Sequence, residues 1–300
     1  MINNYLEFKA KHRMHNFAVL DGLIEMMERC GVDQETISLA IQLMVDDRCK
    51  YELGGSRMNL FSNNLFGNRC VGNFFNYLCG IEDKLGPDGM KEFLTATIYN
   101  ISNNMDAYDQ MDRSKPTNFM NLFLRELVIA FPEDVKLINS GTSMKDLGPN
   151  TNSGNIEAVI GGVCLGHIHF DEGKTNVNNI QFTDFRTLPG LEKRGLGSYI
   201  FGEFCRQVVA EKPGYTVTAC NVANGRDGEK TYSNWGAYPT NNYMLDGYDF
   251  YYDEKPLTQE ELDAWGDKPK LYYFTHETIQ HLAEKESPQY GHDSETDEME

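Results

Sequence analysis

Two glycines lie between a strand-like segment and a helix-like segment, in the order that suits a phosphate-binding loop. Residues 179–188 read as a strand, Gly195 and Gly197 as a tight turn, and residues 196–210 as a helix. Glycine lets backbone amides approach a ligand closely, and a helix N-terminus adds unpaired N–H groups with partial positive charge. The combination predicts a cradle for a pyrophosphate group.

The spacing excludes the two commonest nucleotide-binding loops. A P-loop carries Lys and then Ser or Thr after its last glycine, whereas Leu196 follows Gly195 in this chain. A dinucleotide fingerprint needs a third glycine at position 200, which is Ile200. The loop is therefore neither of these.

The same segment resembles the acetyl-CoA loop of the GCN5-related N-acetyltransferases, the GNAT superfamily, whose motif is Gln/Arg-x-x-Gly-x-Gly/Ala. Here the motif reads Glu-Lys-Arg-Gly-Leu-Gly from Glu192 to Gly197, with Glu at the first position in place of Gln or Arg. The resemblance covers about residues 156–252 and does not reach the N-terminal part of the chain.

The residues after the loop carry the resemblance further. The family follows its helix with a strand, an Asn, and a second helix that ends Tyr-x-x-x-Gly-Phe. This chain has a strand-like run that ends in Asn221, and then Tyr232 four residues before Gly236. Ala237 stands where the family has Phe, with Tyr238 adjacent.

The resemblance implies acyl transfer, with acetyl-CoA as co-substrate and a primary amine of a small molecule or protein as acceptor. A backbone amide near Thr187–Leu188 would hold the thioester carbonyl, and Tyr232 would be the acid that protonates the departing thiolate. A phenol pKa of about 10 suits a thiol near 8.5. The residues implied in CoA binding are Thr187, Leu188, Lys193, Arg194, Gly195, Leu196, Gly197, Ser198, Asn221 and Asn224.

The general base is not evident from the sequence. Alternation along residues 179–188 predicts that no carboxylate shares a face with Thr187 and that Asp184 lies on the opposite face. The residues expected on the face of Thr187 are Phe185, Thr183, Gln181 and Asn179. His167 and His169 share one face of the preceding strand-like run and are the candidate bases, directly or through water. A purely structural role for this pair also stays open.

An alternative function belongs to another class: a catalytically inactive GNAT-fold binding or scaffold protein. Glu192 and the absence of an evident base favour it, whereas Tyr232 at the matching spacing favours an enzyme.

A second motif, from His276 to His281, resembles the zinc-protease pattern HExxH but is one residue too long. The two histidines would lie about 140° apart on a helix, so no metal site is assigned.

The elements that position these residues define an α+β fold. Residues 1–135 read as a helical region, with Asp33 capping one helix and further helices beginning near Pro87 and Pro116. This region is a candidate substrate or partner module. The resemblance does not assign the family's first strand, and two of these helices could stand in for the pair that the family has before its second strand. Residues 136–285 read as a GNAT-like mixed sheet with flanking helices, beginning with a loop over residues 139–155. Strands are expected at residues 156–170, 179–188, 215–222, 243–252 and 271–275, and a capping box at residues 258–261 begins a short helix. Residues 286–300 are expected to form a disordered acidic tail.

Composition limits the partners. The chain has 300 residues, with 27 Lys and Arg against 45 Asp and Glu, so its net charge is −18. Such a field repels a phosphate backbone, which excludes nucleic acid and favours a cationic or neutral acceptor. No stretch has the roughly 20 apolar residues that a membrane span needs. Seven scattered cysteines and the lack of a secretory signal favour the cytoplasm. The oligomeric state is left open.

Overall fold

The computed structural model describes residues 6–7, 17–45, 68–111, 119–148, 151–172, 178–188, 191, 195–221, 226–245, 249–265 and 270–285. The chain divides into two compact units. The first comprises Met1–Lys136, Val159–Leu165 and Leu188–Arg194, and the second comprises Leu137–Ala158, Gly166–Thr187 and Gly195–Glu300. The predicted acidic tail, residues 286–300, lies outside the described residues.

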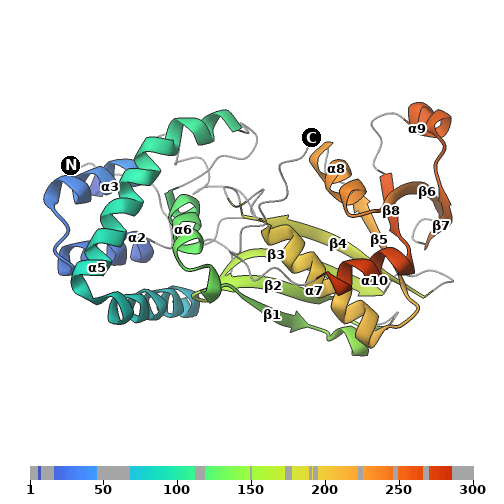
Figure 1. The fold of residues 1–300 in the computed structure, drawn as a ribbon, viewed down its shortest axis with the longest axis horizontal. Coiled ribbons are helices and arrows are strands. Elements are labelled where there is room, and N and C mark those ends of the chain that lie inside the picture. Colours follow the sequence, from blue (N-terminus) through green and yellow to red (C-terminus); the bar gives the residue numbers. More distant parts are fainter. Residues whose placement is uncertain are drawn as a thin grey trace. The chain divides into compact units, whose positions relative to one another are not determined.

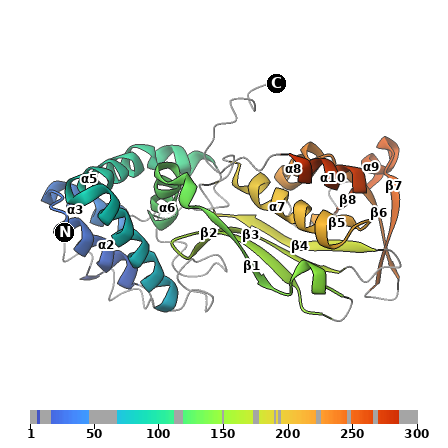
Figure 2. The same ribbon diagram turned by 60° about the horizontal axis from the view of Figure 1, so that its bottom comes forward.

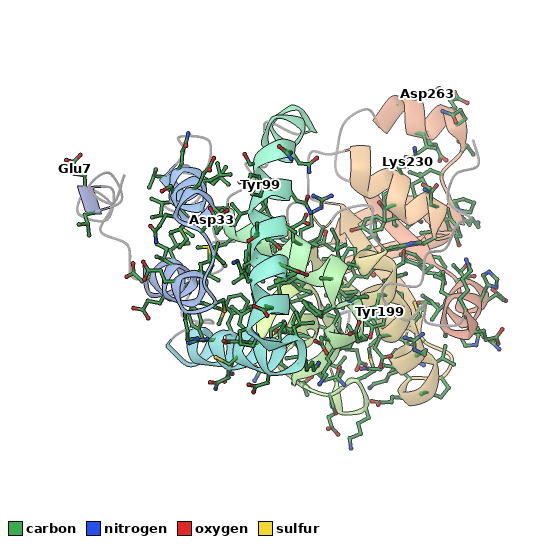
Figure 3. The ribbon with its side chains drawn as sticks, turned by 60° about the vertical axis from the view of Figure 1, so that its left-hand side comes forward. Glu7, Asp33, Tyr99, Tyr199, Lys230 and Asp263 are labelled. Carbon is green, nitrogen blue, oxygen red and sulfur yellow. The ribbon has the colours of Figure 1, made fainter. Side chains whose placement is uncertain are left out.

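The first unit is largely helical (Figure 1). Its helices are α2 (Phe17–Arg29), α3 (Gln34–Val45), α5 (Asn68–Met111) and α6 (Phe119–Ala130). The predicted cap is confirmed, because the Thr36 amide donates to Asp33 Oδ1 at 2.8 Å; Asp33 is labelled in Figure 3. α5 consists of two helical segments separated by a kink at Gly86, where φ is 71°, so a helix begins near Pro87 as expected. None of the helices in the described part of the chain is long and apolar enough to span a membrane.

A tight turn between two strands packs against α5 within this unit. Gly161 and Gly162 both have positive φ, 55° and 78°. A Cβ at Gly161 would lie 2.7 Å from Cδ1 of Tyr77, and the Tyr77 hydroxyl donates to Asp134 Oδ2 at 3.0 Å. Both the backbone conformation and the space at this position therefore require glycine.

We expect Gly161→Ala to destabilise the protein by about 1–3 kcal/mol, because it combines backbone strain with overlap on the Tyr77 ring. Chemical denaturation monitored by circular dichroism measures the change. Gly31→Ala is the control, since Gly31 also has positive φ (72°) but a Cβ added there would have no atom within 4 Å. Equal losses in the two variants would show that crowding against Tyr77 contributes nothing.

The second unit contains most of an eight-stranded mixed sheet with the order β1-β2-β3-β4-β5-β8-β6-β7. The strands are β1 (Lys136–Gly141), β2 (Gly154–Ile160), β3 (Val163–Glu172), β4 (Asn179–Thr187), β5 (Thr216–Asn221), β6 (Tyr238–Leu245), β7 (Asp249–Pro256) and β8 (Lys270–Phe274). The remaining elements are α7 (Leu196–Glu211), α8 (Arg226–Asn234), α9 (Gln259–Trp265), α10 (His276–Glu284) and the 3-10 turns η2 (Pro132–Asp134) and η3 (Met144–Asp146). β4 and β5 run parallel, whereas β3–β4, β5–β8, β6–β8 and β6–β7 are antiparallel.

The α+β architecture expected from the sequence is confirmed, with three corrections. The loop predicted over residues 139–155 is wrong at both ends, because β1 includes residues 139–141 and β2 begins at Gly154. β1 is a largely exposed edge strand, so it lacks the apolar alternation that would have revealed it. The runs at 156–170 and 243–252 are each two strands, β2–β3 and β6–β7. The capping box is confirmed, since the Thr258 amide donates to Glu261 Oε2 at 2.8 Å.

Two helices of the second unit, α7 and α10, cover one face of the sheet. Figures 1 and 2 show α7 and α10 over the same side of the strands, and α10 packs against α7. Aromatic side chains fill the space between this face and the helices. They include Phe170, Phe182, Phe201, Phe204 and Phe274, each of which is at most 2% exposed.

Candidate active site

The N-terminus of α7 presents unpaired backbone amides at the predicted glycine loop. Gly195 is the N-cap, with φ 76° in the left-handed region, and no side chain of the described residues caps the helix. The first intrahelical bond runs from the Tyr199 amide to the Gly195 carbonyl at 2.8 Å, so the amides of residues 196–198 precede it. A Cβ added at Gly195 would have no atom within 4 Å. The positive φ and the open space fit a pyrophosphate; Lys193 and Arg194 lie outside the described residues.

Gly197 lies close to β4. A Cβ at Gly197 would be 3.2 Å from Cζ of Phe185 and 4.0 Å from Cγ2 of Thr187. The first turn of α7 can approach the end of β4 this closely only because residue 197 has no side chain. Leu196, by contrast, is buried, and Ser198 is exposed beside the open N-terminus.

The sheet opens where β4 leaves β5. The parallel register runs from Asn179 opposite Thr216 to Phe182 opposite Ala219, and then it stops. β4 nevertheless continues to Thr187, while β5 continues to Asn221 as the partner of β8. The last five residues of β4 therefore have one backbone edge that is not paired with β5.

The orientation of that edge distinguishes the two amides proposed for the thioester carbonyl. The Leu188 amide already donates to the Leu165 carbonyl at 2.7 Å. In an antiparallel ladder, alternate residues bond to the partner strand, so the Thr187 N–H points away from β3 and into the opening. Of these two amides, that of Thr187 is thus the one directed toward the opening.

Tyr232 lies beside the same opening. Its ring centroid is 5.6 Å from that of Phe182, the last β4 residue in register with β5, and 5.3 Å from that of Tyr272 on β8. Tyr232 is 9% exposed. The structure therefore brings together Tyr232, Thr187 and the glycine loop on the helix-covered face. Asn221 is the last residue of β5, opposite Lys270, and Asn224 lies outside the described residues.

A β-bulge overturns the predicted alternation along β4. The register places Asp184 opposite His169 but Phe182 opposite Phe170, so Thr183 is an extra residue. Phe182 and Phe185 consequently share one face, and both ring centroids lie near that of Phe201 on α7, at 5.7 and 6.5 Å. Gln181 and Asn179 are therefore not on the face of Thr187 and Phe185, as simple alternation had indicated.

The opposite face of the sheet carries the two candidate histidines. His167 Nε2 lies 3.4 Å from Asp184 Oδ2, and Arg186 Nε donates to Asp184 Oδ1 at 2.6 Å. The rings of His167 and His169 meet edge to face, with centroids 4.7 Å apart. The sequence predicted only that Asp184 lies on the face opposite that of Thr187. The structure shows that Asp184 is the carboxylate partner of His167.

Burial and charge set the protonation of this cluster. Burial raises the pKa of Asp184, but hydrogen bonds from His167 and Arg186 outweigh it, so the pKa lies below its ordinary value. Burial and the neighbouring His167 lower the pKa of His169. Near neutral pH the cluster therefore combines an ionised carboxylate with an uncharged His169, which can accept a proton.

Sequence reasoning missed three residues of this face. Asn155 Nδ2 donates to Glu157 Oε1 at 2.5 Å and to Ser140 Oγ at 3.0 Å, and Ser140 donates to the same Glu157 oxygen at 3.0 Å. A Cβ at Gly154 would overlap Phe170 on the helix-covered side, so alternation turns Asn155 and Glu157 to the histidine side. The alternation of polar residues at positions 155 and 157 could have indicated Asn155 and Glu157, but the loop expected over residues 139–155 includes residue 155. No group of three or more His, Cys, Asp or Glu among the described residues could hold a metal ion.

The order of elements around the opening is the one that the GNAT resemblance implied: strand β4, glycine turn, helix α7, parallel strand β5 and helix α8. The first strand of the sheet along the chain, which the resemblance did not assign, is β1. Only η3 separates it from β2 among the described residues, so α2, α3, α5 and α6 precede β1 and do not lie between the first two strands.

Comparisons with known proteins find similar structures but no similar family model or curated sequence. The chain is similar to a Desulfovibrio desulfuricans protein described as an acetyltransferase of the GNAT family, with 9% identity over 47% of this chain and 99% of that chain, at a TM-score of 0.33. It is also similar to a Bacillus subtilis acetyltransferase solved with CoA, with 10% identity over 47% and 98% of the two chains, at 0.30. An acetyltransferase from Streptococcus agalactiae gives 13% identity over 59% and 86%, at 0.29. No protein-family model and no curated protein matches the sequence.

Proposed function

We propose that this protein is an acyl-CoA-dependent N-acyltransferase that transfers an acetyl group from acetyl-CoA to a primary amine. The observation that carries the proposal is the opening between β4 and β5 after Phe182, with the α7 glycine turn and Tyr232 beside it on one face. A strand edge with unpaired amides, a pyrophosphate cradle and a proton donor are three of the parts that this chemistry needs.

Each part has a defined task. The uncapped amides of residues 196–198 would hold the pyrophosphate, with Gly195 and Gly197 leaving room for it. The Thr187 amide would donate to the acyl carbonyl, and Tyr232 would hold the proton that the leaving sulfur needs. When bound, acetyl-CoA supplies an activated acyl carbon. Lys193, Arg194, Asn221 and Asn224 complete the proposed CoA contacts, and His167 and His169 are the proposed proton acceptors.

The acceptor is proposed to be cationic, in keeping with the net charge of −18. We place the protein in the cytoplasm and propose neither nucleic acid nor a membrane as a partner. Residues 136–285 would form the acyltransferase domain, and residues 1–135 a substrate or partner module.

The test combines binding and turnover. Calorimetry measures CoA affinity, and release of free thiol measures turnover with acetyl-CoA and a panel of polyamines, amino acids and peptides. We expect CoA to bind and at least one amine to gain an acetyl group, detected by mass spectrometry. CoA binding without transfer to any amine would instead support the inactive scaffold protein, and absence of both would reject the acyl-CoA site.

A further inference from the structure

The polar face of β1–β4 contains a buried amide oxygen without a hydrogen-bond partner. Asn155 is 8% exposed, and its Oδ1 bonds to no group among the described residues. A carboxylate can only accept, so the atom of Asn155 that faces Glu157 must be the amide nitrogen, and the unpartnered atom is the oxygen. Buried acceptors are nearly always satisfied in proteins, so a donor from elsewhere is expected at this oxygen.

Two more unused acceptors lie on the same face. Both Ser140 and Asn155 donate to Oε1 of Glu157, and no described residue donates to Oε2. His169 on the next strand makes no hydrogen bond through either ring nitrogen in the described part of the chain, and its ring contact is with His167. An amide oxygen, a carboxylate oxygen and an imidazole nitrogen thus face the same side of β2 and β3.

We propose that Asn155, Glu157 and His169 form the binding site for the primary ammonium group of the acceptor amine, and that His169 takes its proton. A primary ammonium has three N–H donors and no acceptor, which suits three acceptors of which one is anionic. The identification of this amine as the acyl acceptor rests on the proposed function. The binding itself needs no acetyl-CoA.

The proton transfer is balanced within this site. An N–H bond of the ammonium breaks, and its electron pair stays on the amine nitrogen as the lone pair. A new N–H bond forms on the imidazole of His169, and the imidazolium later passes this proton to solvent. The lone pair makes the amine nucleophilic.

The charged groups around His169 give the site a pH dependence. Glu157 on β2 and Asp184 on β4 favour a proton on His169, whereas His167 on β3 and Arg186 on β4 oppose it. Burial and His167 prevail, so the pKa lies below the ordinary histidine value of about 6.5. Ammonium binding should therefore be complete at neutral pH and should be lost as the pH falls through this pKa, because an imidazolium repels the ligand.

The probe for binding is n-butylamine, with tetramethylammonium as a control of equal charge that has no N–H donor. Histidine ring resonances are followed by NMR at constant ionic strength, with His169 assigned from His169→Gln. We expect n-butylamine, and not tetramethylammonium, to shift the His169 resonances saturably. Equal shifts from both cations, or none from n-butylamine, would overturn the site.

Variants locate the binding groups. Glu157→Gln keeps an acceptor for Asn155 and Ser140 but removes the charge, so n-butylamine should bind about tenfold more weakly or worse. Asn155→Leu removes the buried amide oxygen, and n-butylamine should also bind this variant more weakly. Thr183→Ala, in the exposed bulge of β4, is the matched control and should bind as the wild type does. Unchanged affinity in Glu157→Gln would overturn the proposal even if Asn155→Leu fails to fold.

The role of His169 as proton acceptor is tested separately. His169→Gln should lower the acetylation rate by about 10²–10⁴-fold, removing the acid limb of the pH–rate profile, while CoA affinity is unchanged. Full activity with the same profile would overturn the role of His169 alone. If the wild type acetylates no amine but n-butylamine still binds, the proposed function fails and the ammonium site stands.

Discussion

Tyr232→Phe is expected to lower turnover by about 10²–10⁴-fold, the usual contribution of a general acid. The substitution removes the proton donor and keeps the ring that packs against Phe182 and Tyr272. CoA affinity should barely change, because the hydroxyl is asked to act in the transition state and not in binding. Stopped assays of thiol release with the best amine of the panel measure the effect.

A structural role for Tyr232 predicts the reverse pattern. Loss of a buried hydroxyl's hydrogen bond costs about 1 kcal/mol of stability and leaves turnover alone. Tyr272→Phe is the matched control, since this tyrosine is 2% exposed and belongs to the same ring cluster. Full activity in Tyr232→Phe would remove the residue from the mechanism and leave water, or one of the two histidines, as the acid.

Gly197→Asp is expected to weaken CoA binding by about 100-fold or more, since a charge-assisted hydrogen bond is typically worth about 1.5–3 kcal/mol and here repulsion replaces it. The new side chain also meets Phe185, which a Cβ would approach to 3.2 Å. Isothermal calorimetry with CoA measures the loss. Gly197→Ala, which adds the Cβ without the charge, should give an intermediate loss.

Gly202→Asp separates a local effect from a change in net charge. Gly202 lies on the same helix, and a Cβ there would meet only the Nη1 atom of Arg206, at 3.6 Å. CoA affinity should stay close to that of the wild type in this variant. If Gly197→Asp binds CoA as tightly as Gly202→Asp does, the pyrophosphate is not held at the start of α7.

Local sequence determined the elements whose signals lie within a few neighbouring residues. The Asp33 cap, the capping box at Thr258 and the turn at Gly195 are all present as expected. Each depends on contacts between residues at most four positions apart, or on the backbone freedom of glycine. The order of strand, turn, helix and strand around Gly195 followed from the same signals.

Only the tertiary structure decided which side chains share the site. The bulge at Thr183 reverses the alternation that predicted the faces of β4, because an extra residue in one strand is visible only against its partner. The pairing of Glu157 with Ser140 joins residues 17 positions apart, and that of Asp184 with His167 spans the same separation. Such contacts depend on strand register, which is specified by the packing of a whole buried face and not by neighbours in the chain. The glycine loop was therefore predictable from the sequence, whereas the acceptors facing the proposed amine were not.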